Sequence, residues 1–105
     1  MFRNKYWQSI LIFFSFLIMV VACSESSRSP KSGREVFRTY CVVCHGAKGN
    51  LGMNGAKDLT NSSLTLQERI HIITNGRKTM QSFEKTLTKE EIAKVAVYTM
   101  TLKEL

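Results

Sequence analysis

Two cysteines and a histidine lie close together near the middle of the chain, in the run Cys41-Val42-Val43-Cys44-His45. Thiols can bond to a cofactor or bind a metal, and a neutral imidazole is a common metal ligand. Two residues between the thiols place the sulfur atoms about one helical turn apart. This C-x-x-C-H spacing is typical of covalent haem attachment, in which each thiol bonds one vinyl group and the histidine binds the iron. The run predicts one covalently bound haem c per chain, held by Cys41 and Cys44, with His45 as an axial ligand.

Two other kinds of site use a C-x-x-C pair. A thioredoxin-like redox pair belongs to a fold with a βαβ pattern, and the sequence shows no such pattern. A zinc site needs about four ligands, but no second pair of cysteines or histidines follows, and His71 alone leaves too few. Covalent haem attachment is therefore the favoured interpretation.

The first 22 residues read as a targeting segment. Arg3 and Lys5 form a short basic start, and the run from Ile10 to Ala22 is apolar apart from one serine. A helix of that length spans roughly 20 Å, which is short for a bilayer core of about 30 Å and typical of a signal peptide. We predict a signal peptide over 1–22, and extension of the run by residues 6–9 leaves an uncleaved anchor as the alternative.

The end of this segment, Val20-Val21-Ala22-Cys23, resembles the lipobox of bacterial lipoproteins. The resemblance implies that Cys23 receives a diacylglyceryl group and becomes the first residue after cleavage. Two or more acyl chains hold a protein stably on a membrane. The polar, serine-rich stretch that follows predicts a flexible tether over 23–31. The expected product is an exported, membrane-anchored lipoprotein, with a domain at 32–105 in the periplasm or on the outer side of the membrane.

Three helix starts share one signature, a hydroxyl residue followed three positions later by glutamate. In this capping box the two residues satisfy each other's backbone N–H groups. The pairs are Ser32 with Glu35, Thr65 with Glu68, and Thr88 with Glu91. They predict helices over about 33–40, 66–75 and 89–103. The segment 46–63 holds four glycines and no alternating pattern, so we expect an irregular loop there.

Apolar spacing indicates which face of each helix is buried. The first helix should bury Val36, Phe37 and Tyr40. The second should bury Leu66, Ile70 and Ile73 and end at Gly76. The third should bury Ile92, Val95, Ala96, Thr99 and Leu102.

Taken in this order, several short stretches resemble class I cytochromes c over about residues 32–105. The stretches are Gly33 with Phe37, Cys41 to Gly46, Gly55 to Thr60, Ile73 to Gly76, Met80 to Phe83, and Ile92 with Val95, Ala96 and Tyr98. The resemblance implies an all-α fold of three main helices and irregular loops around one haem. It also implies that Gly33 and Phe37 cross Val95 and Tyr98.

Met80 is the expected second axial ligand. It lies 35 residues after His45 in a loop between two helices, and the resemblance places the distal methionine at this position. Met53, His71 and water are the alternatives, although Met53 is expected to pack at the haem edge and His71 to lie on a helix surface. Two positions depart from the family, which often has proline where this chain has Lys57 and Gln81. The Lys57 carbonyl can still accept a hydrogen bond from the imidazole, but both changes suggest a softer pocket.

With both axial positions filled, no coordination site remains for a substrate, and a thioether raises the reduction potential. The sequence therefore predicts a single-electron carrier in a periplasmic or membrane-associated electron-transfer chain, and no enzyme. One alternative is a ligand-binding or sensor module with a labile sixth ligand. Another is an electron-entry subunit of a larger redox enzyme.

The charge of the chain bears on its partners. The formal net charge is +7, and without Arg3 and Lys5 it is +5, from 13 basic and 8 acidic residues. A basic surface can steer an acidic partner, so we expect a redox donor and acceptor with acidic docking surfaces. Aromatic and basic residues do not interleave, so no nucleic-acid partner is expected. We expect a monomer.

Overall fold

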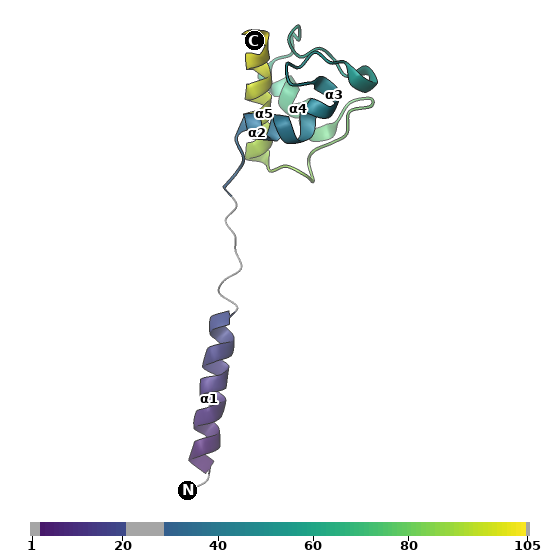
Figure 1. Cartoon of the computed structure of the whole chain (residues 1–105). Coiled ribbons are helices and arrows are strands. Elements are labelled where there is room, and N and C mark those ends of the chain that lie inside the picture. The colour runs from purple at the N-terminus through teal and green to yellow at the C-terminus, as the bar shows by residue number, and fades with distance from the viewer. Residues whose placement is uncertain (1–2, 21–28, 105) are drawn as a thin grey trace.

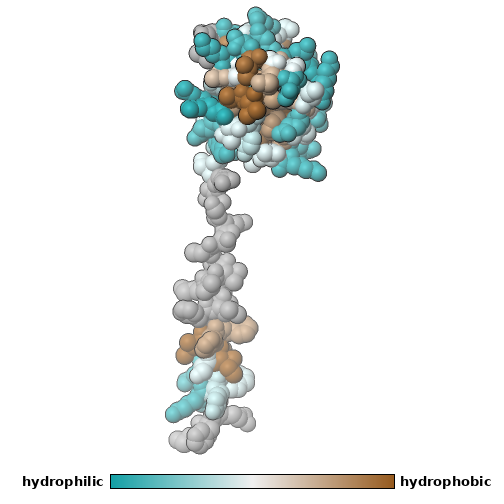
Figure 2. All heavy atoms as spheres, turned by 45° about the vertical axis from the view of Figure 1, so that its right-hand side comes forward, coloured by the Kyte–Doolittle hydropathy of each residue, from teal (hydrophilic) through white to brown (hydrophobic). Residues whose placement is uncertain are grey.

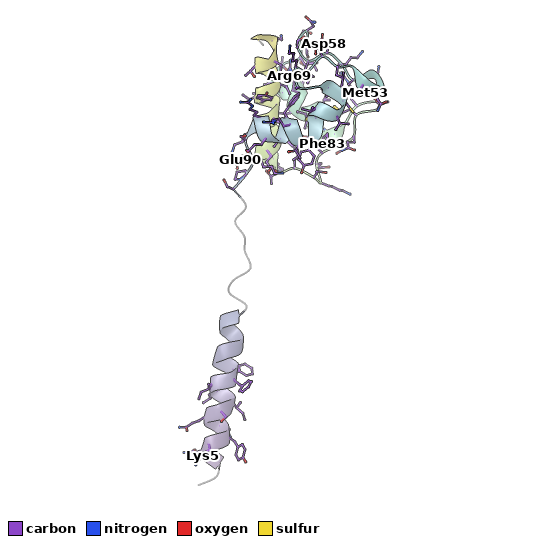
Figure 3. The ribbon with its side chains drawn as sticks, in the orientation of Figure 1. Lys5, Met53, Asp58, Arg69, Phe83 and Glu90 are labelled. Carbon is purple, nitrogen blue, oxygen red and sulfur yellow. The ribbon has the colours of Figure 1, made fainter. Side chains whose placement is uncertain are left out.

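The computed structural model of the chain describes residues 3–20 and 29–104. The first stretch is one helix, α1 (Arg3–Val20), which contains most of the apolar run and begins close to Lys5 (Figures 1 and 3). Within the described residues, no helix has both the length and the apolar character needed to cross a membrane. The predicted cleavage site and Cys23 lie outside the described residues. The signal peptide, the lipid anchor and the tether therefore remain predictions.

Helical residues run without a break from the predicted first capping box to the predicted haem motif. The run consists of α2 (Gly33–Val36), a π-helical segment η1 (Phe37–Cys41) and α3 (Val42–His45). The sequence places the end of this helix near residue 40. The structure carries it further because the Val42 N–H donates to the Phe37 carbonyl, five residues back. Such wide turns occur often near functional sites, and this one leads directly into the second cysteine and the histidine.

The other two predicted helices are confirmed. They are α4 (Leu66–Asn75) and α5 (Lys89–Thr101), and α5 continues into a 3₁₀ turn, η3 (Leu102–Glu104). All three capping boxes form with both of their hydrogen bonds. Gly76 ends α4 with a φ of 77°, a conformation that glycine adopts without steric cost. The described residues form no strand, only an isolated bridge between Arg77 and Met80, so their fold is all-α.

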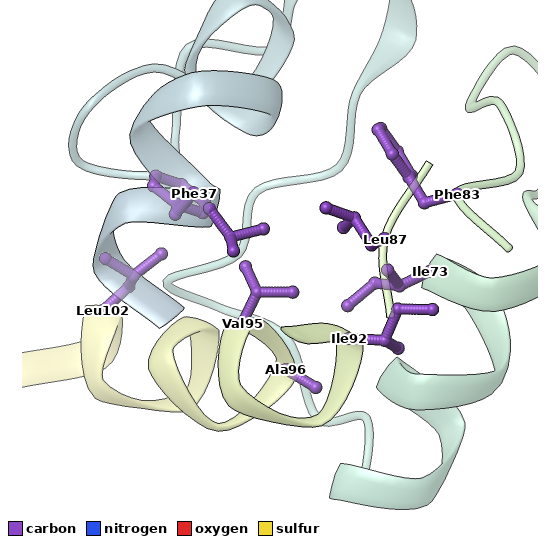
Figure 4. Close-up of a cluster of buried hydrophobic side chains, with 9 residues drawn as sticks. Phe37, Ile73, Phe83, Leu87, Ile92, Val95, Ala96 and Leu102 are labelled. Atoms are coloured by element: carbon purple, nitrogen blue, oxygen red, sulfur yellow. The ribbon is translucent and has the colours of Figure 1, made fainter. Parts of the chain in front are cut away.

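One hydrophobic cluster holds the helices of residues 33–104 together (Figure 4). Every residue that the pattern of α5 predicted to be inside is buried. Two further members, Phe83 and Leu87, come from the loop before α5. This loop has no helical periodicity from which their burial could be predicted. The cluster contains Val36, Phe37, Ile73, Phe83, Leu87, Ile92, Val95, Ala96 and Leu102.

The helix α2 crosses α5 at Gly33, as the resemblance implied. A Cβ atom at Gly33 would overlap the Lys94 carbonyl oxygen and would lie 2.7 Å from its carbonyl carbon. One turn further along, the ring centroids of Phe37 and Tyr98 are 5.3 Å apart and tilted by 56°. A glycine at this crossing therefore allows two helix backbones to approach closely, and the two aromatic rings pack beside it.

The capping boxes make the stability of the fold depend on pH. Hydrogen bonds from the cap residues hold the pKa of Glu35, Glu68 and Glu91 below the ordinary value of 4.5. Since the unfolded chain then binds more protons than the folded one in acid, the stability from these carboxylates is complete above about pH 4.5. It is lost as the pH falls through the lowered values.

We expect the melting temperature to fall on acidification below about pH 4.5. Replacing all three glutamates by glutamine should make that fall shallower, and differential scanning calorimetry across pH 3–6 measures it on the native protein and the triple variant. Glu84→Gln removes a carboxylate outside the capping boxes and is the matched control. An equally steep fall in the triple variant would rule out this origin of acid sensitivity.

Candidate functional site

Cys41 and Cys44 occupy successive turns of the first helical run. Cys41 is the last residue of η1, Cys44 lies in α3, and both thiols are free and half-buried. Burial, helped by the neighbouring Cys44, raises the pKa of the Cys41 thiol to about 11. A redox-active C-x-x-C pair requires a cysteine with a lowered pKa, so this environment disfavours the thioredoxin-like interpretation.

His45 ends α3, and its ring orientation is set by a distant backbone group. Its Nδ1 atom lies 3.1 Å from the carbonyl oxygen of Lys57. Because a carbonyl oxygen only accepts, Nδ1 must carry the hydrogen, and Nε2 keeps its lone pair for a metal. Burial lowers the pKa of His45, and the bond to Lys57 raises it in part, so the neutral imidazole is favoured. The expectation that the Lys57 carbonyl accepts from this histidine is confirmed.

The glycine-bearing loop returns Lys57 to the end of α3. The Leu51 N–H donates to the His45 carbonyl at 2.9 Å, and the Leu59 N–H donates to the Gly49 carbonyl at 2.8 Å. Gly49 has a φ of 83°, and a Cβ there would lie 2.8 Å from Leu102 Cδ1, so the loop also packs against the end of α5. The irregular loop predicted over 46–63 is confirmed, with one short 3₁₀ turn, η2 (Met53–Gly55).

Met80 lies in a tight turn after α4. The backbone groups of Arg77 and Met80 form two hydrogen bonds of 3.0 Å, one in each direction. Met80 is half-buried and packs against the hydrophobic cluster. A Cβ at Gly76 would lie 2.6 Å from the Met80 carbonyl oxygen, so only glycine leaves room for the turn to fold back against the end of α4.

The chain after Met80 is attached to the carboxyl end of α4. The Ser82 hydroxyl donates to the Thr74 carbonyl at 2.5 Å, and the Phe83 N–H donates to the Ile73 carbonyl at 3.0 Å. These donors satisfy two of the last carbonyl groups of the helix, which have no partner within it. The loop that carries Met80 is thereby tied to a regular element, although Gln81 stands where a proline was expected.

Three large apolar side chains are exposed on α3 and on the loop that follows it. Val43 is 73% exposed, Leu51 56% and Met53 50%. Figure 2 shows one face of the folded domain on which hydrophobic residues gather within a surround of hydrophilic ones, and Figure 3 places Met53 at the edge of the domain. A large flat apolar group is the kind of partner that such side chains can cover. The apolar side chains, the two thiols, the imidazole with a free Nε2 and the thioether together fit haem c.

One alternative ligand, His71, and a further methionine, Met100, lie on the surface. His71 is exposed on α4, where its Nδ1 atom lies 3.2 Å from the side-chain nitrogen of Asn75, as expected for a surface histidine. Met100 is 42% exposed on α5. In the part of the chain that the structure describes, no three His, Cys, Asp or Glu side chains gather into a metal site.

A buried arginine was not predicted from the sequence. Arg69 of α4 is 4% exposed, and its guanidinium donates to the Thr99 hydroxyl at 3.0 Å and to the Leu64 and Ser62 carbonyls (Figure 3). Burial lowers its pKa. A charged residue is ordinarily expected on the outer face of a helix, whereas this one is buried between Thr99 of α5 and the 62–64 segment that precedes α4.

Known proteins with related sequences were found by comparison. Residues 28–98 match the model of a family described as cytochrome C oxidase, cbb3-type, subunit III. A cytochrome c6-like protein from Nostoc sp. (strain PCC 7120) is 27% identical, and the match covers 92% of each chain. A cytochrome c6 from Rippkaea orientalis is 32% identical, over 87% of this chain and 86% of that protein. Another from Leptolyngbya boryana is 33% identical, over 66% of this chain and 87% of that protein.

Proposed function

We propose that this chain, which belongs to the cbb3-type subunit III family of c-type cytochromes and binds one haem c covalently, carries single electrons between redox proteins. Its relatives named cytochrome c6 match it over 86% and 87% of their own length. The proposal covers the carrier role, the residues that hold the haem and the location of the protein.

Four side chains take part at the haem. Cys41 and Cys44 would hold it covalently, and His45 and Met80 would bind its iron. The observation that carries this assignment is the hydrogen bond from His45 Nδ1 to the Lys57 carbonyl. It leaves the lone pair of Nε2 free to bind iron, in the residue directly after the two thiols.

Bound haem c supplies a one-electron iron couple. The protein residues then have three tasks. The Lys57 carbonyl holds the His45 ring in one tautomer and orientation, the attachments of the Met80 loop limit movement of the thioether, and the exposed apolar side chains of Val43, Leu51 and Met53 exclude water from the haem edge. A site with both axial positions filled and little freedom to move suits electron transfer and leaves no position for a substrate.

Carbon monoxide tests this proposal against the ligand-binding alternative. The dithionite-reduced native protein should show the spectrum of covalent haem c after addition of pyridine, and its visible spectrum should not change on exposure to carbon monoxide. Rapid binding of carbon monoxide by the native protein would overturn the carrier proposal and would favour a module with a labile sixth ligand.

A fixed place in a larger redox complex is the second candidate, because the matching family is described as an oxidase subunit. We favour a stand-alone carrier, since the cytochrome c6 relatives match at 32% and 33% identity. Affinity purification of the native protein in mild detergent distinguishes the two. A stoichiometric set of redox subunits that stays bound through washing at high salt would contradict the stand-alone carrier.

For its location we propose an exported protein held on a membrane by lipid on Cys23. The support is the order of a basic start, an apolar run, a cysteine and a polar serine-rich stretch. Haem staining of soluble and membrane fractions should find the native protein with the membranes and Cys23→Ser in the soluble fraction. Equal retention of Cys23→Ser in the membrane would show that the uncleaved apolar segment, and not lipid, is the anchor.

Salt should slow the reaction with an acidic partner. Lys57, Arg77 and Lys78 are exposed, and they lie in the two loops that carry the partner of His45 and the Met80 turn. Attraction between exposed charges is screened over about 8–10 Å at physiological ionic strength. We expect the second-order rate constant to fall on the order of tenfold between low and physiological salt.

Stopped-flow oxidation by an acidic and by a basic redox protein measures this effect. The rate with the acidic partner should fall with ionic strength, and the rate with the basic partner should rise. A rate with the acidic partner that does not change with ionic strength would argue against electrostatic steering by this surface.

A further inference from the structure

The turn that carries Met80 is fastened to a second loop. The Thr79 hydroxyl donates to the Asn54 carbonyl at 2.9 Å, which joins residues 25 apart in the sequence. Asn54 is the middle residue of η2, and Thr79 is the residue directly before Met80. We propose that Thr79 is a positioning residue that keeps Met80 on the haem iron by holding its turn against η2. This inference rests on the proposed role of Met80 as the sixth ligand.

The backbone on both sides of this hydrogen bond adopts an uncommon conformation. Asn54 has a φ of 52° and Lys78 a φ of 55°, and they are the two residues other than glycine with positive φ in the described segments. Such conformations persist where the surroundings determine them. The hydrogen bond from Thr79 joins the residue after Lys78 to Asn54 itself, so each unusual turn supports the other.

The two ends of the Met80 loop are held in different ways. Beyond Met80, Ser82 and Phe83 are bonded to the carboxyl end of α4. Before Met80, the backbone bonds between Arg77 and Met80 close the turn upon itself, and Thr79 attaches it to another part of the fold. Gln81 supplies none of the backbone stiffness that proline would. Hydrogen bonds on both sides of the methionine therefore take the place of a stiff chain.

Loss of the Thr79 bond should raise the fraction of molecules in which Met80 has left the iron. A competing ligand reports that fraction, because its apparent dissociation constant equals the intrinsic constant divided by the fraction of open sites. One intramolecular hydrogen bond changes such an equilibrium by about two- to tenfold. Imidazole added to the oxidised holoprotein is a suitable competitor, since it binds ferric iron and changes the visible spectrum.

The experiment titrates imidazole into the oxidised native holoprotein and four variants. Thr79→Val keeps the branched shape and removes the hydroxyl, whereas Thr79→Ser keeps the hydroxyl. Thr86→Val makes the same chemical change at an exposed threonine of the same loop and is the matched control. Met80→Ala gives the dissociation constant of a fully open site. Melting temperatures of all five proteins show whether each variant is folded.

We expect Thr79→Val to bind imidazole about two- to tenfold more tightly than the native protein. It should also lose part of the absorption band that is specific to methionine bound to ferric iron. Thr79→Ser and Thr86→Val should behave like the native protein. If Met80→Ala tightens binding but Thr79→Val does not, the positioning role is overturned and the ligand role of Met80 stands. If the native protein already binds as tightly as Met80→Ala, Met80 is not the ligand and both inferences fall.

Discussion

Replacing Met80 by alanine is expected to convert a closed haem site into an open one. The thioether is half-buried against the hydrophobic cluster, and alanine at this position has no atom that could bind iron. The reduced Met80→Ala protein should bind carbon monoxide stoichiometrically, whereas the native protein should not. Its reduction potential should fall by on the order of 0.1 V, a part of the ~0.8 V that axial ligands span.

The chain supplies its own controls for this experiment. Met53 is 50% exposed in η2 and Met100 is 42% exposed on α5, so Met53→Ala and Met100→Ala make the same change at other methionines. Met100→Ala should keep the native spectrum, the native potential and the lack of response to carbon monoxide. Met53→Ala should keep the native spectrum and the lack of response, although its potential can shift because Met53 shields the haem edge. If Met53→Ala opens the site and Met80→Ala does not, the sixth ligand has been assigned to the wrong loop.

Replacing Gly33 by alanine is expected to destabilise the fold, although alanine is the better helix former. Helix propensity alone would make the change stabilising by about 1 kcal/mol. The added Cβ, however, would overlap the Lys94 carbonyl and would lie 3.0 Å from Tyr98 Cβ. The helices α2 and α5 must therefore move apart. Overpacking of this kind costs about 1–3 kcal/mol, and here it opens the contact that closes the core. With the helix-propensity gain subtracted, the net cost reaches about 2 kcal/mol, and the melting temperature should fall by up to roughly 15 °C.

Thermal unfolding followed by circular dichroism on the oxidised holoprotein measures this effect. The sign of the change in melting temperature shows whether the clash at Gly33 outweighs the gain in helix propensity. Gly55→Ala is an informative companion, because no atom lies within 4 Å of a Cβ placed there and its φ is 75°. That variant carries a conformational cost of about 1 kcal/mol without a clash. A melting temperature that rises in Gly33→Ala would show that the two helices do not need this close approach.

The helices could be predicted because their signals are local. Each capping box joins residues three apart, so Thr65 and Glu68 determine where α4 begins whatever the rest of the chain does. Gly76 ends that helix in the same local manner. The end of the helical run that begins at Gly33 was predicted too early, because the sequence after Tyr40 contains no signal for a wide π-helical turn. The backbone bond between Val42 and Phe37 carries the helix through to His45.

The sequence by itself determined the thiol spacing, the histidine that follows it, the helix starts and the apolar faces, since each depends on residues within about one or two turns of one another. The Lys57 contact with His45 was expected from the family resemblance and not from any local pattern. Only the tertiary structure decided that Arg69 is buried and that Thr79 reaches Asn54. The last contact joins residues 25 apart, and the Lys57 contact spans 12. No local pattern encodes such contacts, because they form where the packing of the helices brings the loops together.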